Sequence, residues 1–134
     1  MRYMLDSNIM IYALRRPKDQ IHQRILVHLN HDLCISSITY EELIHGIYRS
    51  SDPVKNLTNL QKILLGIDIL SFDDRAAHAA GRIHAELERA GTPIGGYDIL
   101  IAGHAKSSDA ILVTNNMREF QRIPGLRLED WIVR

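Results

Sequence analysis

The sequence predicts an α/β fold of three layers, with helices on both faces of a central, mostly parallel sheet of about four to five strands. Two patterns predict it: short apolar runs of strand length recur along the chain, and longer segments with helical periodicity separate them. Because parallel strands need crossover connections that are usually helical, this alternation favours a parallel sheet. The 134 residues fit one domain, which we expect to span 1–134.

The expected strands are apolar and short, and they cover residues 3–5, 33–35, 67–70, 111–113 and, more weakly, 126–128. Two helices are expected after the first strand and two after the second. A long helix and a further helix follow the third strand, and a short helix follows the fourth. The long helix is the clearest, since apolar residues of segment 76–87 recur at three- and four-residue steps. Gly91 and Pro93 are typical of the end of such a helix.

Composition limits the class of protein. Sixteen basic residues balance sixteen acidic ones, which argues mildly against a nucleic-acid binder, although converging acids would leave the remaining surface more basic. The single cysteine, Cys34, lies in an apolar run and is expected to be a buried thiol. No apolar stretch approaches the ~20 residues of a membrane span. Since Asp6 comes too early for a signal-peptide core, we expect a soluble, cytoplasmic protein with no membrane contact.

Polar side chains follow the expected strands where each strand ends. In a parallel sheet these carboxyl ends meet at one edge, and ligands bind there. Asp98 does not follow a strand but opens a helical run after Gly95 and Gly96. The candidate site residues are Asp6, Glu42, Asp98, Thr114, Asn116 and Glu119.

Taken singly, these residues also suit helix caps. Asp6 or Ser7 is positioned to cap the first helix, and Asp98 in a first turn is favoured by the helix dipole. Thr39 and Glu42 have the spacing of a capping box, and Asn116 repeats that spacing with Glu119 three residues later. A structural role for all of them is therefore one interpretation of the pattern.

Taken together, the acids indicate a cation site. Like charges ~4 Å apart cost ~4 kcal/mol per pair at an effective dielectric constant of about 20. A folded protein tolerates such a cluster only if the acids bind protons or a cation lies among them. Because every candidate donor is oxygen, Mg²⁺ or Mn²⁺ is the natural ion, and an ion held this way supports hydrolysis of a phosphate ester. Arg15, Arg16, Arg118 and Arg122 flank the expected site and are candidates for contact with an RNA backbone.

The chain also resembles the VapC toxins of bacterial toxin–antitoxin pairs, whose fold is the PIN domain. Four motifs in order carry the resemblance: Met4-Leu5-Asp6-Ser7-Asn8; Ile35-Ser36-Ser37-Ile38-Thr39 with Glu42-Leu43; Pro93-Ile94-Gly95 leading through Asp98 to Ile101-Ala102-Gly103-His104-Ala105; and Val113-Thr114-Asn115-Asn116 with Glu119-Phe120. Landmarks near the end are Arg122-Ile123-Pro124-Gly125-Leu126 and Glu129-Asp130-Trp131.

The resemblance implies a PIN-like three-layer fold and assigns roles to the candidates. It places Asp6, Glu42 and Asp98 in the acidic metal-binding core, and it makes Thr114 and Asn116 the polar residues that orient ligands and water. The chain departs from the family where many relatives place a fourth acid, because Asn116 stands there. Glu119 is the candidate to supply that charge, through water.

The resemblance further implies an endoribonuclease that uses Mg²⁺ or Mn²⁺ and is inhibited by a cognate VapB-type antitoxin. The motifs around Pro93 and Thr114 are similar to the branch that cleaves initiator tRNA in its anticodon stem-loop. Family members pair as dimers, so we expect a homodimer and a higher assembly with the antitoxin.

Other functions fit the residues less well. A phosphohydrolase with an aspartate nucleophile needs a second acid two positions on, where this chain has Asn8. A receiver-type signalling module needs a lysine after the last strand, and that strand leads into Glu129 instead. A metal-dependent phosphohydrolase and a non-catalytic α/β binding module stay as the alternatives.

Overall fold

The structure, a computed structural model, describes residues 2–16, 20–28 and 32–132. The order of its helices and strands is the predicted one. The elements are β1 (Arg2–Leu5), α1 (Ser7–Arg15), α2 (Gln20–His28), β2 (Leu33–Ser36), α3 (Ser37–Tyr48), α4 (Pro53–Leu64), β3 (Asp68–Leu70), α5 (Asp74–Ala90), α6 (Gly96–Ser107), β4 (Ala110–Val113), α7 (Met117–Phe120) and β5 (Leu128–Glu129).

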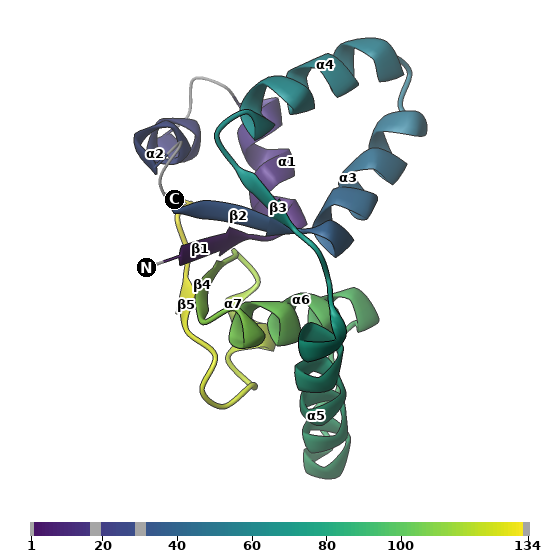
Figure 1. The fold of residues 1–134 in the computed structure, drawn as a ribbon, viewed down its shortest axis with the longest axis vertical. Helices are drawn as coiled ribbons and strands as arrows, with labels where there is room; N and C mark the ends of the chain where they lie inside the picture. Colours follow the sequence, from purple (N-terminus) through teal and green to yellow (C-terminus); the bar gives the residue numbers. More distant parts are fainter. Residues whose placement is uncertain (1, 17–19, 29–31, 133–134) are drawn as a thin grey trace.

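The strands form one parallel sheet in the order β3-β2-β1-β4-β5, which confirms the predicted α/β class. β1 is central, with β2 on one side and β4 on the other (Figure 1). Leu5 pairs with Val113, and Val113 pairs with Glu129, so the carboxyl ends of β1, β4 and β5 are level. The last strand was predicted at 126–128 but lies at Leu128–Glu129, because residues 123–126 form a turn closed by the Leu126 N–H on the Ile123 carbonyl.

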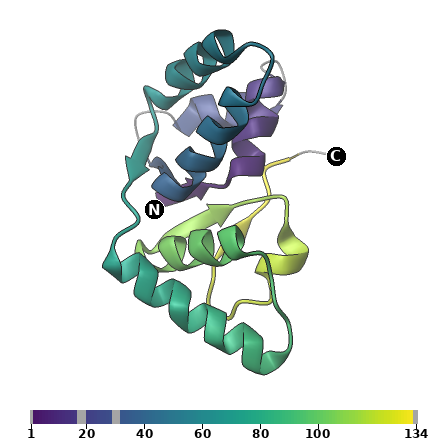
Figure 2. The same ribbon diagram turned by 90° about the vertical axis from the view of Figure 1, so that its right-hand side faces the viewer.

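The sheet separates two apolar cores, since side chains alternate between its faces. Leu5, Ile35 and Val113 belong to the core that contains residues of α1–α4. Met4 and Cys34 point to the opposite core, which contains residues of α5–α7. Figures 1 and 2 show the two groups of helices on opposite sides of the strands. This is the predicted three-layer arrangement.

Two single residues are buried in the apolar cores, and for Cys34 the sequence predicted this. Cys34 is fully buried, and burial raises the pKa of its thiol to about 11, so it is a core residue and not a nucleophile. Trp131 is also buried and packs against the rings of Tyr3 and His28. Within the described ranges, no helix has the length and apolar character that crossing a bilayer requires.

The helices α5 and α6 pack tightly against each other, and they run in roughly opposite directions in the view of Figure 2. Gly91 ends α5 in the left-handed conformation, with φ of 68°, and its N–H bonds to the Glu88 carbonyl. Gly103 of α6 faces the backbone of Ala80 so closely that a Cβ at residue 103 would lie 2.5 Å from the Ala80 nitrogen. The close approach fixes α6, and with it Asp98 in its first turn, against α5.

This contact predicts opposite effects of alanine at two helical glycines. Gly81 lies next to Ala80 but on the open side of α5, where an added Cβ meets nothing within 4 Å. We expect Gly81→Ala to raise the free energy of unfolding by about 1 kcal/mol through helix propensity. We expect Gly103→Ala to lower it by about 1–3 kcal/mol, because the helices must move apart. Urea unfolding of both variants checks this, and equal effects would contradict the packing.

Candidate active site

Polar side chains lie at the carboxyl ends of four strands, along one edge of the sheet. The Asp6 N–H donates to the Val113 carbonyl at 3.1 Å, and the Thr114 N–H donates to the Glu129 carbonyl at 3.0 Å. These bonds extend the ladder past the strand ends and therefore set Asp6 beside Thr114. Ser36 ends β2, and Asp130 follows β5.

Asp6 is the most buried of the acids, with 5% of its surface exposed. Its carboxylate caps α1 by accepting from the Ile9 N–H at 2.9 Å, and the Thr114 hydroxyl donates to it as well. Burial raises the pKa of Asp6 to about 6, against these two hydrogen bonds, and the charges of Asp98 and Asp130 raise it further. Asp6 is thus both the predicted cap and a member of the acidic cluster.

Glu42 reaches the same edge from α3. Burial raises its pKa, a hydrogen bond from the Ser7 hydroxyl lowers it, and the charges of Asp98 and Asp6 raise it. Glu42 therefore lies close enough to Asp6 and Asp98 for their negative charges to repel its own. Ser7, the first residue of α1, holds the Glu42 carboxylate toward the end of β1.

Asn116 joins two further acids. Its side-chain amide donates to Asp98 Oδ2 at 3.4 Å and to Glu119 Oε2 at 3.3 Å. Asp98 is half-buried in the first turn of α6, and burial together with the nearby Glu119 carboxylate raises its pKa. The amide hydrogen bond lowers that pKa, so Asn116 partly neutralises the pair that it bridges.

The two predicted capping boxes are both wrong. Ser36, not Thr39, caps α3, because β2 runs directly into the helix and the Ser36 Oγ accepts from the Ile38 N–H at 3.1 Å. Thr39 lies in the first turn, fully buried, and its hydroxyl has no hydrogen-bond partner among the described residues. Asn116 stands at the N-cap of α7, but its side chain turns to Asp98 and Glu119 and makes no cap bond.

A buried pair ties the Glu42 helix to the Asp98 helix. The Ser36 hydroxyl and Nδ1 of His104 are hydrogen bonded at 2.8 Å, and the imidazole meets the Phe72 ring edge-on. Burial lowers the pKa of His104, so the neutral ring is favoured. His104 is a packed helix residue, and it fixes the start of α3 against α6.

The structure therefore brings together all six predicted residues and adds two that sequence reasoning missed. Asp130 acts on Asp6 by its charge, and Ser7 bonds to Glu42. Asp130 was missed because the last strand was predicted to end at residue 128, one residue before its end at Glu129, so the acid did not directly follow the predicted strand. Ser7 belongs to the first motif of the resemblance, but its bond to Glu42 was not predicted, since which acid its hydroxyl meets depends on how α1 and α3 pack.

The arginines that flank the site in the sequence differ in exposure and in the groups that they contact. Arg15 and Arg16 are exposed at the end of α1, and the Arg16 guanidinium lies 4.1 Å from the centre of the Tyr12 ring. Arg122 donates to the Pro93 carbonyl at 3.0 Å and so supports the loop before α6. Contact of these arginines with RNA stays a prediction.

The donor set fits a small hard cation. Every side chain that meets here carries oxygen, although Asn116 directs its NH2 group to two of the acids, and the four predicted acids are electrostatically coupled. Among the described residues no three carboxylate, histidine or cysteine side chains are grouped closely enough to enclose an ion. Mg²⁺ suits such an open arrangement, because proteins hold it through one or two carboxylates and leave its other positions to water and phosphate.

The PIN domain family matches residues 3–126. The chain is 44% identical over 131 residues to the tRNA(fMet)-specific endonuclease VapC of Salmonella typhimurium and 45% identical over 132 residues to that of Shigella flexneri, covering 98% of each protein and of this chain. A crystal structure of DNA-bound VapBC from Salmonella typhimurium superposes with a TM-score of 0.92 at 44% identity, over 98% of this chain and 99% of that one.

The buried Asp6 predicts a specific pH dependence of stability in EDTA. Because its folded pKa of about 6 exceeds the ordinary 3.8, the free energy of unfolding falls as pH rises from about 4 through 6, and the loss is about 3 kcal/mol at neutral pH. Asp6→Asn removes that charge and keeps the cap. We expect the variant to unfold at higher urea than wild type at pH 7.5, with the difference shrinking as pH falls toward 4. A variant that is less stable at pH 7.5 would contradict the assignment.

Proposed function

Because the chain belongs to the VapC family of PIN-domain proteins, we propose that it is the toxin of a type II toxin–antitoxin pair, an endoribonuclease that cleaves initiator tRNA. The observation that carries the proposal is the gathering of Asp6, Glu42, Asp98 and Glu119 at one edge of the sheet. We further propose that the cut falls in the anticodon stem-loop and that it blocks translation in the cytoplasm.

We propose that Mg²⁺ or Mn²⁺ binds between these acids, with Asp6, Glu42 and Asp98 as its ligands and Glu119 acting through water. When bound, the ion supplies an activated water and stabilises the leaving oxygen of the phosphodiester. The support is the chemistry of the chain: a 5% exposed aspartate with a raised pKa is stabilised as the anion when a cation lies beside it.

The remaining residues position these groups. Thr114 donates to Asp6 and also accepts from the Asn116 N–H at 2.9 Å, so one hydroxyl fixes a ligand and the turn that follows β4. Asn116 holds Asp98 and Glu119 at a common distance from its amide. Ser7 orients Glu42. The carboxylates are therefore preorganised before substrate arrives, which lowers the cost of assembling the site.

For the partner we propose a VapB-type antitoxin, as in the VapBC complexes that the chain resembles. A groove of about 200 Å³ between α1, α3 and α4 supports this proposal. Apolar side chains including Ile11, Leu14 and Leu43 line it, and it reaches Glu42. A segment with apolar side chains that lies in this groove would close one approach to the carboxylates. The homodimer expected from the family stays a prediction.

We expect Asp98→Asn to abolish RNA cleavage while the protein stays folded. Asparagine keeps the size and hydrogen bonding of aspartate in the first turn of α6 but removes a charged ligand. The assay compares initiator tRNA, elongator tRNAs and an unstructured RNA with Mg²⁺ or Mn²⁺, and with EDTA. If the variant cuts as well as wild type, the acids are only structural, as in the binding-module alternative. A wild type that hydrolyses small phosphate esters but no RNA would favour the phosphohydrolase alternative.

Asn116→Asp tests the bridging amide. The change replaces a donor by a third carboxylate next to Asp98 and Glu119, so we expect tighter Mg²⁺ binding and lower stability in EDTA. Each like-charge contact adds up to ~4 kcal/mol at ~4 Å in a medium of dielectric constant about 20. Isothermal titration with Mg²⁺ and urea unfolding measure the two effects. Asn116→Ala, which removes the bridge without adding charge, is the control and is expected to lower stability without tightening Mg²⁺ binding.

A further inference from the structure

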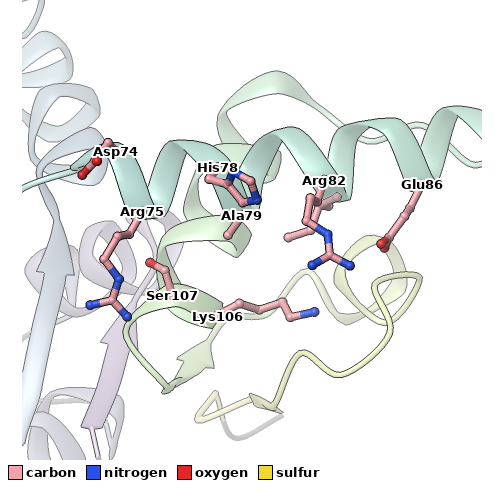
Figure 3. Close-up of a pocket in the computed structure, with 9 residues that line it drawn as sticks. Asp74, Arg75, His78, Ala79, Arg82, Glu86, Lys106 and Ser107 are labelled. Atoms are coloured by element: carbon pink, nitrogen blue, oxygen red, sulfur yellow. The ribbon is translucent and has the colours of Figure 1, made fainter.

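A second polar groove lies away from the acidic edge. It runs along α5 from Asp74 to Glu86, beside the end of α6, and has a volume of about 730 Å³. Figure 3 shows its charged side chains, with Arg75 and Arg82 directed from α5 toward the strip of α6 that carries Lys106 and Ser107. His78 lies on α5 between the two arginines. None of the six candidate site residues lines this groove.

The arginines of this groove are free to bind a ligand. Within the described part of the chain, neither Arg75 nor Arg82 takes part in a salt bridge or a side-chain hydrogen bond. Lys106 donates from Nζ to the Pro124 carbonyl at 3.0 Å, which uses one of its three donors. Asp74 and Glu86 also line the groove, but neither comes within salt-bridge distance of a cation there.

An RNA substrate needs cations away from the cut. The acidic edge repels phosphate unless a metal ion is present, and the chain has no net positive charge to compensate. The groove lies at the opposite end of α6 from Asp98, eight residues along the helix, which corresponds to about 12 Å. A stacked strand covers that distance in about four nucleotides at ~3.4 Å each. A tRNA bound at the acidic edge is large enough to reach the groove.

We propose that the groove lined by Arg75, Arg82 and Lys106 binds the phosphate backbone of the RNA substrate outside the active site. This inference rests on the proposed ribonuclease function and deepens it. Arginine forks and a lysine ammonium are the groups that recognise phosphate oxygens in proteins. The lining favours RNA over a protein partner, because five of its nine residues are Asp, Glu, Lys or Arg, whereas the core of a protein interface is depleted of charge.

The test measures binding of uncut RNA. The full chain carrying Asp98→Asn is titrated with tRNA(fMet) in EDTA between 50 and 200 mM salt, with and without Arg75→Gln and Arg82→Gln together. Lys55→Gln with Lys62→Gln is the matched control, because these residues have the same seven-residue spacing on α4, are exposed, and lie on the other side of the sheet (Figure 1). Thermal unfolding of each variant checks that it stays folded.

We expect the groove variant to weaken tRNA binding about five-fold at 0.15 M salt for each phosphate that its arginines no longer neutralise. The slope of log Kd against log salt should fall by about 0.7–0.9 for each such phosphate. The control should bind as the parent does. Unchanged binding by the groove variant, or an equally weakened control, overturns the proposal.

Two further outcomes separate this inference from the proposed function. Failure of wild type to cut any tRNA with Mg²⁺ counts against the ribonuclease, whereas the groove is judged by the binding difference alone. If the groove variant binds tRNA normally but loses affinity for the antitoxin, the groove binds an acidic protein segment and the RNA proposal is wrong.

Discussion

The rest of the fold is arranged around the charge of Asp6, buried at the end of the central strand. β1 is the central strand, with β2 on one side and β4 on the other, so little of Asp6 at its end is exposed to water. The α1 backbone and the Thr114 hydroxyl donate to the carboxylate but do not offset its burial, as its raised pKa indicates. Glu42 and Asp98 come from helices on opposite faces of the sheet, and their charges add to the same unfavourable field. The unfavourable electrostatic energy of these buried carboxylates is therefore concentrated around Asp6, and a bound cation would reduce it.

Asn116 shows how the chain limits that cost. A carboxylate at this position would face Asp98 and Glu119 together, whereas the amide donates to both. Asp98 and Glu119 therefore have a neutral amide between them instead of a third negative charge. Hydrogen bonding thus supplies part of the stabilisation that a second metal ion would supply in a more acidic site. The hydroxyls of Ser7 and Thr114 have the same effect on Glu42 and Asp6, because each stabilises a charged carboxylate that burial disfavours.

Much of this was predictable from the sequence, because it depends on local patterns. The alternation of apolar runs with helical periodicity predicted the order of the helices and strands, and the strand-end rule predicted Asp6 and Thr114. The errors occurred where tertiary contacts decide between local options. Thr39 has the spacing of a cap, but β2 continues to Ser36 and leads the chain into α3 three residues earlier. The bond between Ser36 and His104 joins residues 68 positions apart, and the groove beside Arg82 forms only when α5 and α6 meet. No pattern in a single segment contains that information.

The contact between Gly103 and Ala80 has a consequence for where an RNA strand is cut. With no room for a side chain between them, α5 and α6 cannot slide or separate without breaking a packed interface. The distance between the arginines of α5 and Asp98 is therefore fixed. An RNA backbone bound at the arginines would place a set number of nucleotides between them and Asp98. Position along the strand, and not only the identity of the bases, would then select the scissile bond.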